Sequence, residues 1–205
     1  MRFLQFKEQL ENFIIFNLND IRKIEVNFDL RRLNEWKSKG YIKIVRRGNY
    51  IFADLEVNES VLFLIAQKIY APSYVSLEMA FAYYNLIPEG VYAVTSVTSQ
   101  KTNIFKSPVG EFIYSHVKPE FLFGYKLLEY QGHNYKIAEV EKALLDYFYL
   151  NRRFATDDDF SEMRFNAEEF IKIASKRKVM SYLKVFHNKK LEQRVKRFLE
   201  FIHYA

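Results

Sequence analysis

The order of hydrophobic patterns in the first 54 residues constrains the fold more than any other feature of the chain. Residues 3–13 have the three-and-four spacing of an amphipathic helix, and residues 19–24 predict a second short helix that Asn19 or Asp20 can cap. A third helix pattern opens at Asn27 and ends at Gly40, and two β-rich runs joined at Gly48-Asn49 follow. Three helices and a hairpin are the order of a winged helix-turn-helix.

The third helix pattern separates an apolar face from a polar one. Leu30, Leu33 and Trp36 share the face that we expect to dock on the first two helices. The other side is rich in Arg and Asn, which can pair with guanine and adenine edges in the major groove. The predicted DNA-reading residues of this helix are Asn27, Arg31, Arg32, Glu35 and Ser38.

The tip of the predicted hairpin adds a second set of DNA contacts. Arg46, Arg47 and Asn49 lie where they can reach phosphate or an adjacent minor groove. The alternative is a winged helix that contacts only protein. Glu35 on the reading face and the modest charge of this segment, 11 Lys and Arg against 7 Asp and Glu, favour that alternative.

The charge of the chain is concentrated at its two ends. Residues 55–150 hold 7 basic against 10 acidic residues, whereas residues 151–205 hold 13 against 8. Basic ends on a near-neutral body predict acidic partners for those ends, although a surface charge of this size also serves solubility. No leader peptide and no membrane-spanning run is visible in the sequence, so we expect a cytoplasmic protein that has no membrane partner.

The middle of the chain carries the most specific motifs. SYVSLEMAFAYYNLIPE covers Ser73–Glu89 and leads into VYAVTSVTS, and EKALLD covers Glu141–Asp146. In this order, behind a winged helix, the segments resemble the AbiEi family of type IV antitoxins over residues 5–150. One departure is Val140, which precedes EKALLD where the family often has Pro.

The resemblance implies a repressor that binds duplex operator DNA upstream of its own operon, in an abortive-infection (phage defence) system. It also implies a second role, the antagonism of a nucleotidyltransferase-like toxin, either directly or indirectly. The residues that carry the antitoxin motif are Ser73, Tyr74, Ser76, Pro88, Glu89, Thr95, Thr98, Glu141, Lys142 and Asp146. The alternatives are a stand-alone regulator without a toxin and an enzyme that modifies the toxin.

The motifs also predict local structure. Ser76 is placed to cap a helix over Leu77–Asn85, and the following Thr-rich strand has a polar face that is either a solvated surface or a binding surface. Lys142 and Asp146, one turn apart, predict a pair worth a few tenths of a kcal/mol. For the Glu141, Lys142 and Asp146 set, a structural role competes with a catalytic one and with a polar contact between domains.

Several features argue against an enzyme. The chain has no Cys, no glycine-rich phosphate loop and no His spacing typical of a metal site, so we expect no catalytic residue, no metal and no cofactor. The run Asp157–Asp159 suggests either a magnesium site or the start of a helix. We expect the basic last helix to close the core with its apolar face, and its other side to contact the toxin or the toxin's nucleic-acid substrate. No lipidation motif supports the alternative of a helix on a membrane surface.

Together these observations predict an α+β protein with two domains. Residues 1–54 form the winged helix-turn-helix, and residues 55–205 form a mixed α/β antitoxin domain that is helical from about residue 139.

Overall fold

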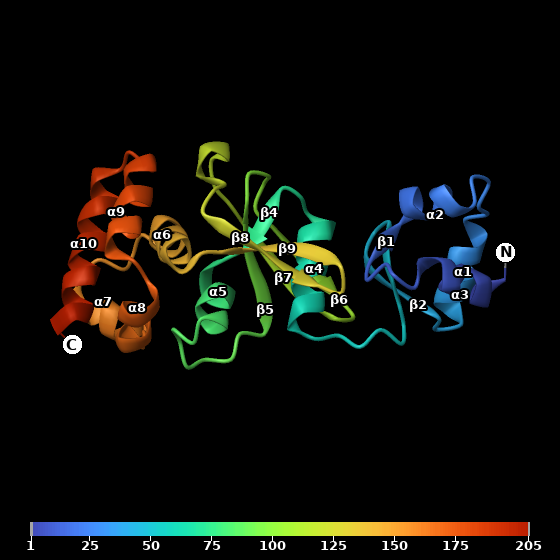
Figure 1. Cartoon of the computed structure of the whole chain (residues 1–205), viewed down its shortest axis with the longest axis horizontal. Helices are drawn as coiled ribbons and strands as arrows, with labels where there is room; N and C mark the ends of the chain where they lie inside the picture. Colours follow the sequence, from blue (N-terminus) through green and yellow to red (C-terminus); the bar gives the residue numbers. More distant parts are fainter. Residues whose placement is uncertain (1, 205) are drawn as a thin grey trace.

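The computed structural model describes residues 2–204, and it begins with a small unit of three helices and a three-stranded sheet (Figure 1). The helices are α1 (Phe3–Leu10), α2 (Leu18–Ile24) and α3 (Arg31–Ser38). The strands are β1 (Phe16–Asn17), β2 (Ile42–Arg46) and β3 (Asn49–Phe52), in the antiparallel order β1-β3-β2. We call residues 3–52 the N-terminal unit.

An aromatic cluster forms the core of the N-terminal unit. The Phe6 ring lies 4.5 Å from Trp36 and 5.7 Å from Phe28, measured between centroids. These buried rings join α1 to α3. Leu33 packs in the same core, but Leu30 is 49% exposed, so the expected docking face is narrower than the sequence predicted.

The prediction that Asn27 opens the third helix is wrong. The helix begins four residues later, and Asp29 accepts a hydrogen bond from the Arg31 amide at 3.0 Å in place of an Asn27 cap. The predicted end is confirmed: Gly40 has a φ of +71°, and the Tyr41 amide donates to the Trp36 carbonyl at 2.9 Å, which closes the last turn.

The second part of the chain is built on a mixed sheet of six strands. Its strands are β4 (Ser73–Val75), β5 (Ala93–Thr98), β6 (Asn103–Ser107), β7 (Gly110–His116), β8 (Tyr125–Tyr130) and β9 (His133–Ala138). The order is β6-β7-β5-β4-β9-β8, with β5–β7 and β4–β9 parallel and the other neighbours antiparallel. The predicted mixed sheet flanked by helices is confirmed.

Helices cover both faces of this sheet. The Tyr114 hydroxyl of β7 donates to the Ala66 carbonyl of α4 (Glu59–Ile69) at 2.6 Å, which places α4 on one face. Thr95 points to the opposite face, where its hydroxyl meets α5 (Leu77–Tyr83). A 3₁₀ turn, η1 (Pro119–Phe121), lies between β7 and β8.

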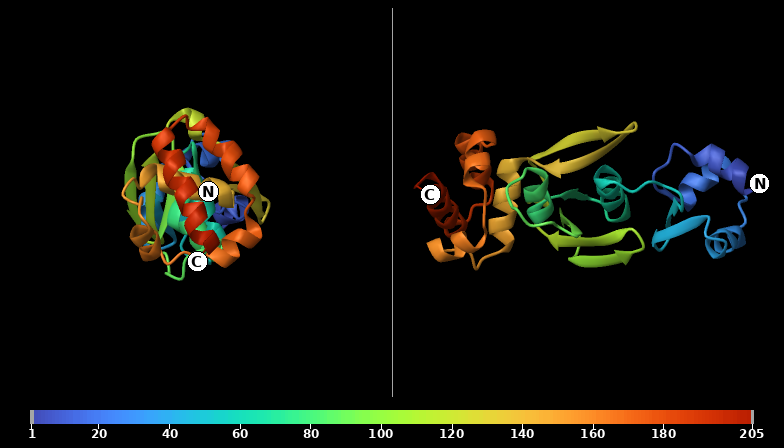
Figure 2. Two further views of the ribbon diagram at one scale, coloured as in Figure 1. Left: turned by 90° about the vertical axis from the view of Figure 1, so that its left-hand side faces the viewer. Right: turned by 90° about the horizontal axis from the view of Figure 1, so that it is seen from below.

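The last third of the described chain is helical. α6 (Val140–Leu150) lies between the sheet and a layer made of α7 (Asp157–Glu162), α8 (Ala167–Ile173), α9 (Lys176–Val185) and α10 (Lys189–Tyr204), as Figure 1 and the right-hand view of Figure 2 show. The rings of Phe148 in α6 and Phe198 in α10 lie 4.9 Å apart, tilted by 50°, and join this layer to the core. Among residues 2–204, no helix is both long and apolar enough to cross a membrane.

The boundary between the two predicted domains falls in the segment between β3 and α4. The N-terminal unit has its own apolar cluster, but four of its residues, Ile14, Ile15, Val45 and Ile51, belong to the larger core of the sheet. The two parts therefore share apolar contacts as well as a peptide connection.

Candidate nucleic-acid interface

The exposed face of α3 is the first candidate for contact with a ligand. The Arg31 side chain is 91% exposed and pairs with Asp29 at 3.2 Å. Hydrogen bonds from Arg31 lower the pKa of the Asp29 carboxyl, and the charge of Arg32 adds to this effect. An exposed pair of this kind is worth about 0–1 kcal/mol, so the Asp29 carboxylate competes only weakly for Arg31.

Other predicted reading residues lie on or near the same face. The Glu35 carboxylate forms an ion pair with the Lys39 ammonium at 2.6 Å, and the Ser38 hydroxyl donates to the Asn34 carbonyl at 2.9 Å. Arg32 is half-buried, and Asn27 is exposed in the turn before the helix. The structure adds Asn34, an exposed residue one turn after Arg31, which the helical period alone would have included.

The hairpin separates its two arginines. Arg47 is exposed in the turn between β2 and β3. The Arg46 guanidinium instead lies 4.4 Å from the Phe105 ring and 5.3 Å from the Tyr70 ring, and it donates to the Ile69 carbonyl. Arg46 thus joins the hairpin to the second part of the chain, and its donors are turned away from the tip.

Asn49, the third residue predicted at the tip, is half-buried at the start of β3 and pairs in register with Asn17 of β1. Of the three predicted tip residues, Arg47 has the most open position.

The antitoxin motif residues fall into two groups. Pro88 and Glu89 are exposed in the loop after α5, where Glu89 pairs with Arg164 at 3.1 Å. The remaining motif residues are buried: Ser73, Tyr74, Ser76, Thr95, Thr98, Glu141, Lys142 and Asp146. The polar strand face expected as a solvated or binding surface is therefore inside the protein.

Four of the buried residues form one hydrogen-bonded network. The Tyr74 and Ser76 hydroxyls each donate to the Asp146 carboxylate at 2.9 Å. The Lys142 ammonium donates to the Tyr74 hydroxyl at 2.8 Å and pairs directly with Asp146. The side chains of both charged residues are 0% exposed, so the surface pair predicted at a few tenths of a kcal/mol is instead a buried ion pair.

Burial has opposite effects on the two charged groups. It lowers the pKa of Lys142 and raises the pKa of Asp146, while their mutual attraction opposes both shifts. The network holds α6 against β4 and has no exposed atom that a substrate could reach, so its geometry is that of a structural element. The rest of the motif acts similarly: Glu141 accepts a hydrogen bond from the Ser175 amide at 2.9 Å and joins α6 to α9.

The predicted Ser76 cap is wrong, because its hydroxyl is committed to Asp146. Thr95 takes that role from the neighbouring strand. Its hydroxyl accepts from the Met79 amide at 3.0 Å and donates to the Ser76 carbonyl at 2.7 Å. Thr98 likewise donates to the Pro72 carbonyl at 2.7 Å. Within residues 2–204, the Ser73 hydroxyl is the one member of this group that has no hydrogen-bond partner.

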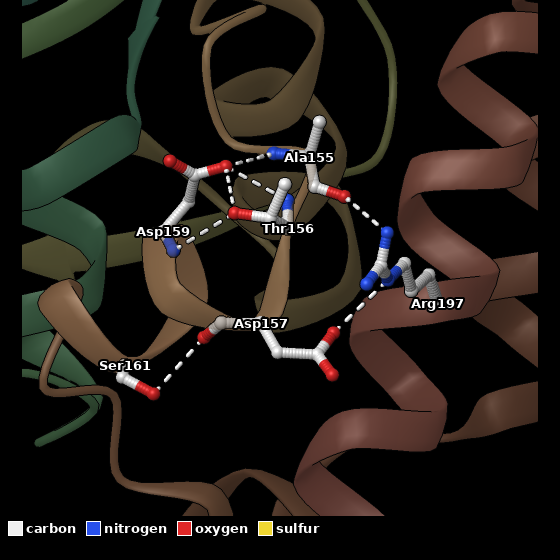
Figure 3. A network of polar contacts seen from close by, with 6 residues as sticks. All are labelled: Ala155, Thr156, Asp157, Asp159, Ser161 and Arg197. Carbon is white, nitrogen blue, oxygen red and sulfur yellow. Dashed lines mark hydrogen bonds and ion pairs between the residues drawn. The ribbon is translucent and has the colours of Figure 1, made fainter.

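The acidic run Asp157–Asp159 opens α7 (Figure 3). Asp159 accepts hydrogen bonds from the Ala155 and Thr156 amides at 3.0 and 2.7 Å, which lower the pKa of its carboxyl. Asp157 pairs with Arg197 at 2.9 Å. The prediction of a helix start is confirmed, and within residues 2–204 no three His, Cys, Asp or Glu side chains are grouped as a metal site requires.

A groove of about 840 Å³ runs along α5, β5 and α6. Its wall combines apolar side chains such as Phe81 and Leu150 with the carboxylates of Glu78, Glu89 and Glu162. Thr95 and Glu89 are the antitoxin motif residues that it reaches.

Compared with models of known protein families, the chain matches none, and a search of curated proteins finds no similar sequence. The resemblance to AbiEi antitoxins therefore remains a prediction based on the motifs.

Proposed function

We propose that this chain is a non-enzymatic regulator of the AbiEi antitoxin type, which binds duplex operator DNA through α3 and the β2–β3 hairpin. The arrangement of the N-terminal unit supports the assignment of a winged helix-turn-helix. Its element order is helix, strand, two helices and a hairpin, and the first short strand pairs with the hairpin. An α-helix of this size fits the major groove of B-DNA.

The open polar face of α3 carries the proposal. In Figure 1, α1 and α3 lie on the side of β1–β3 that faces away from the six-stranded sheet. The Arg31 side chain on this helix is 91% exposed, and Arg47 extends the basic surface at the hairpin turn. In this proposal Arg31 and Asn34 face base edges, and Arg47 contacts phosphate.

The double variant Arg31→Ala/Arg32→Ala tests this interface. We expect at least a tenfold loss of affinity for a duplex from the region upstream of the gene, because two charged contacts are removed. Fluorescence anisotropy at 50 and 200 mM salt measures it, with Arg31→Ala alone as a check because Arg32 is half-buried. The matched control, Lys176→Ala/Arg177→Ala, removes the same charge from exposed positions on α9. Unchanged binding by the first variant would reject α3 as the reading helix.

The antitoxin part of the proposal depends on the sequence resemblance. It predicts that the neighbouring gene encodes a nucleotidyltransferase-like toxin, and that this chain restores growth when the two are expressed together. The Arg31→Ala/Arg32→Ala variant separates the roles, because it should lose repression of the operon and keep growth rescue. Rescue that disappears together with DNA binding would contradict a separate antitoxin function, and the absence of a toxic neighbour would favour a stand-alone regulator.

A further inference from the structure

A basic hollow of about 400 Å³ lies beside the start of α10. Figure 1 places α10 at the opposite end of the molecule from α3. The basic side chains around the hollow come from three separate segments: Lys118, Arg152, His187, Lys189 and Lys190. Three aromatic residues complete its wall: Phe121, Tyr149 and Phe186.

Much of the positive charge at this hollow is uncompensated. Arg152, Lys189 and Lys190 are exposed and form no ion pair or hydrogen bond with any residue in the described range 2–204. The carboxylates nearest to them in sequence already pair with other cations: Asp157 with Arg197 at 2.9 Å, and Glu192 with Lys196 at 2.7 Å. The charge of Lys189 also helps to lower the pKa of the Glu192 carboxyl. Beside the hollow, Glu120 pairs with Lys118 at 3.7 Å.

Arg152 also lies close enough to the neighbouring Arg194 for their charges to repel each other. Arg194 donates to the Phe148 carbonyl at 2.8 Å at the end of α6, and burial lowers the pKa of its guanidinium. The charge of Arg152 lowers that pKa further. Like charges are therefore held close together here at a cost in stability.

The first turn of α10 adds to this cost. Its amide groups form the positive end of a 16-residue helix, where carboxylates are favoured and ammonium groups are not. Lys189 and Lys190 nevertheless begin the helix, whereas the first turn of α8 holds Glu168 and Glu169 and no lysine. Asn188 caps the Leu191 amide at 3.0 Å, and Glu192 in the same turn offsets part of the positive charge. Two ammonium groups that oppose the helix dipole and form no ion pair within residues 2–204 are typical of a functional surface.

We propose that this hollow binds the phosphate groups of a single-stranded nucleic acid, with Arg152, Lys189 and Lys190 as the phosphate contacts. Ammonium and guanidinium groups that lack carboxylate partners suit phosphate oxygens. The hollow is concave and only about as large as one nucleotide, so it suits a flexible strand better than the convex, rigid rod of a duplex. Phe121 and Phe186 are buried and offer no stacking surface, whereas Tyr149 is half-buried in the wall. The three phosphate contacts are the same for every base, so we expect recognition to depend little on base sequence.

The test uses the full chain and a fluorescein-labelled 12-nucleotide single strand of mixed sequence, as RNA and as DNA. Anisotropy at low salt measures the Kd in the Arg31→Ala/Arg32→Ala background, so that the proposed duplex site does not contribute. We expect Lys189→Gln/Lys190→Gln to raise the Kd by about tenfold or more, through the loss of two phosphate contacts. The matched control, Lys176→Gln/Arg177→Gln, removes two exposed charges from the first turn of α9. This turn lies about 15 Å, the length of the helix, from the C-terminal end of α9 that is beside the hollow. The control should therefore change the Kd less than twofold.

Three outcomes would overturn the proposal. In the first, both double variants weaken binding of the single strand equally. In the second, an unlabelled duplex displaces the labelled strand as effectively as an unlabelled single strand does. In the third, ATP or tripolyphosphate binds to saturation and neither oligonucleotide binds. The last outcome would assign the hollow to a free nucleotide. Melting temperature is an independent readout. Lys189→Gln/Lys190→Gln should raise it by about 1–3 °C, because the charge conflict is relieved, and a decrease would show that the lysines stabilise the fold.

Discussion

Lys142 shows how far a residue's environment can differ from its local sequence context. A Lys and an Asp four residues apart on a helix predict an exposed ion pair. Nothing in the local sequence shows that Lys142 and Asp146 are buried. The structure surrounds the Lys142 ammonium with the Phe123 ring at 5.0 Å, the Phe186 ring at 5.3 Å and the Tyr74 hydroxyl. Those partners lie far away in the chain, so only the tertiary fold reveals that the pair is buried.

Removing one partner of this pair should be costly. We expect Asp146→Asn to lower the free energy of unfolding by about 3 kcal/mol or more, because an uncompensated ammonium stays buried. Lys142→Met/Asp146→Asn removes both charges and should recover more than half of that loss. Urea unfolding followed by circular dichroism gives both values. A double variant no more stable than Asp146→Asn would show that the charge conflict is not the cause.

At the scale of helices and strands, the sequence patterns predicted the three helices and the hairpin of the N-terminal unit, the Thr-rich strand and a helical last third, but not β1, α4, β4 or β6. Helix starts are set by which polar group reaches the first free amides, and two kinds of source supply it here. The residue before the helix is one: Asn17 caps α2, in place of the predicted Asn19 or Asp20, and Thr156 caps α7. For α5 the acceptor is Thr95, from a strand 16 residues later than the Met79 amide it satisfies, and no local pattern contains that information.

The cap of α7 provides a test at this scale. Thr156→Ala should cost about 1 kcal/mol, because the hydroxyl's hydrogen bonds with the Asp159 amide and carboxylate are lost at the helix start, while the bond from the Thr156 amide to Asp159 stays. The Ser161→Ala variant is the control, since the Ser161 hydroxyl bonds to the Asp157 carbonyl within the helix and removing it should change stability by less than about 0.5 kcal/mol. Differential scanning calorimetry measures both changes, and equal effects would exclude capping as the cause.

Across the whole molecule, the two parts are joined by side chains as well as by the linker. The sequence predicted Arg46 as a DNA contact because it lies next to the hairpin turn, and the sequence does not show which side chains surround it in the fold. Its aromatic partners, Tyr70 and Phe105, belong to the second part of the chain. The neighbouring Arg47 has none of these contacts and is exposed.

This difference predicts a division of roles between adjacent arginines. Arg46→Ala should lower the free energy of unfolding by about 1–3 kcal/mol through the lost ring and carbonyl contacts. Arg47→Ala should leave stability within about 0.5 kcal/mol and should weaken duplex binding. Thermal unfolding and duplex anisotropy of both variants check the assignment, and a reversed pattern would contradict it.

The position of β4 within the six-stranded sheet has a consequence for synthesis on the ribosome. Once residue 116 has emerged, β4, β5, β6 and β7 can pair, but one edge of β4 must wait for β9, which begins at residue 133. During that interval a nascent chain presents an open strand edge, the kind of surface that recruits other chains. The hairpin of β8 and β9 is thus the segment whose arrival ends the exposure to aggregation, and products of premature termination before it carry that edge permanently.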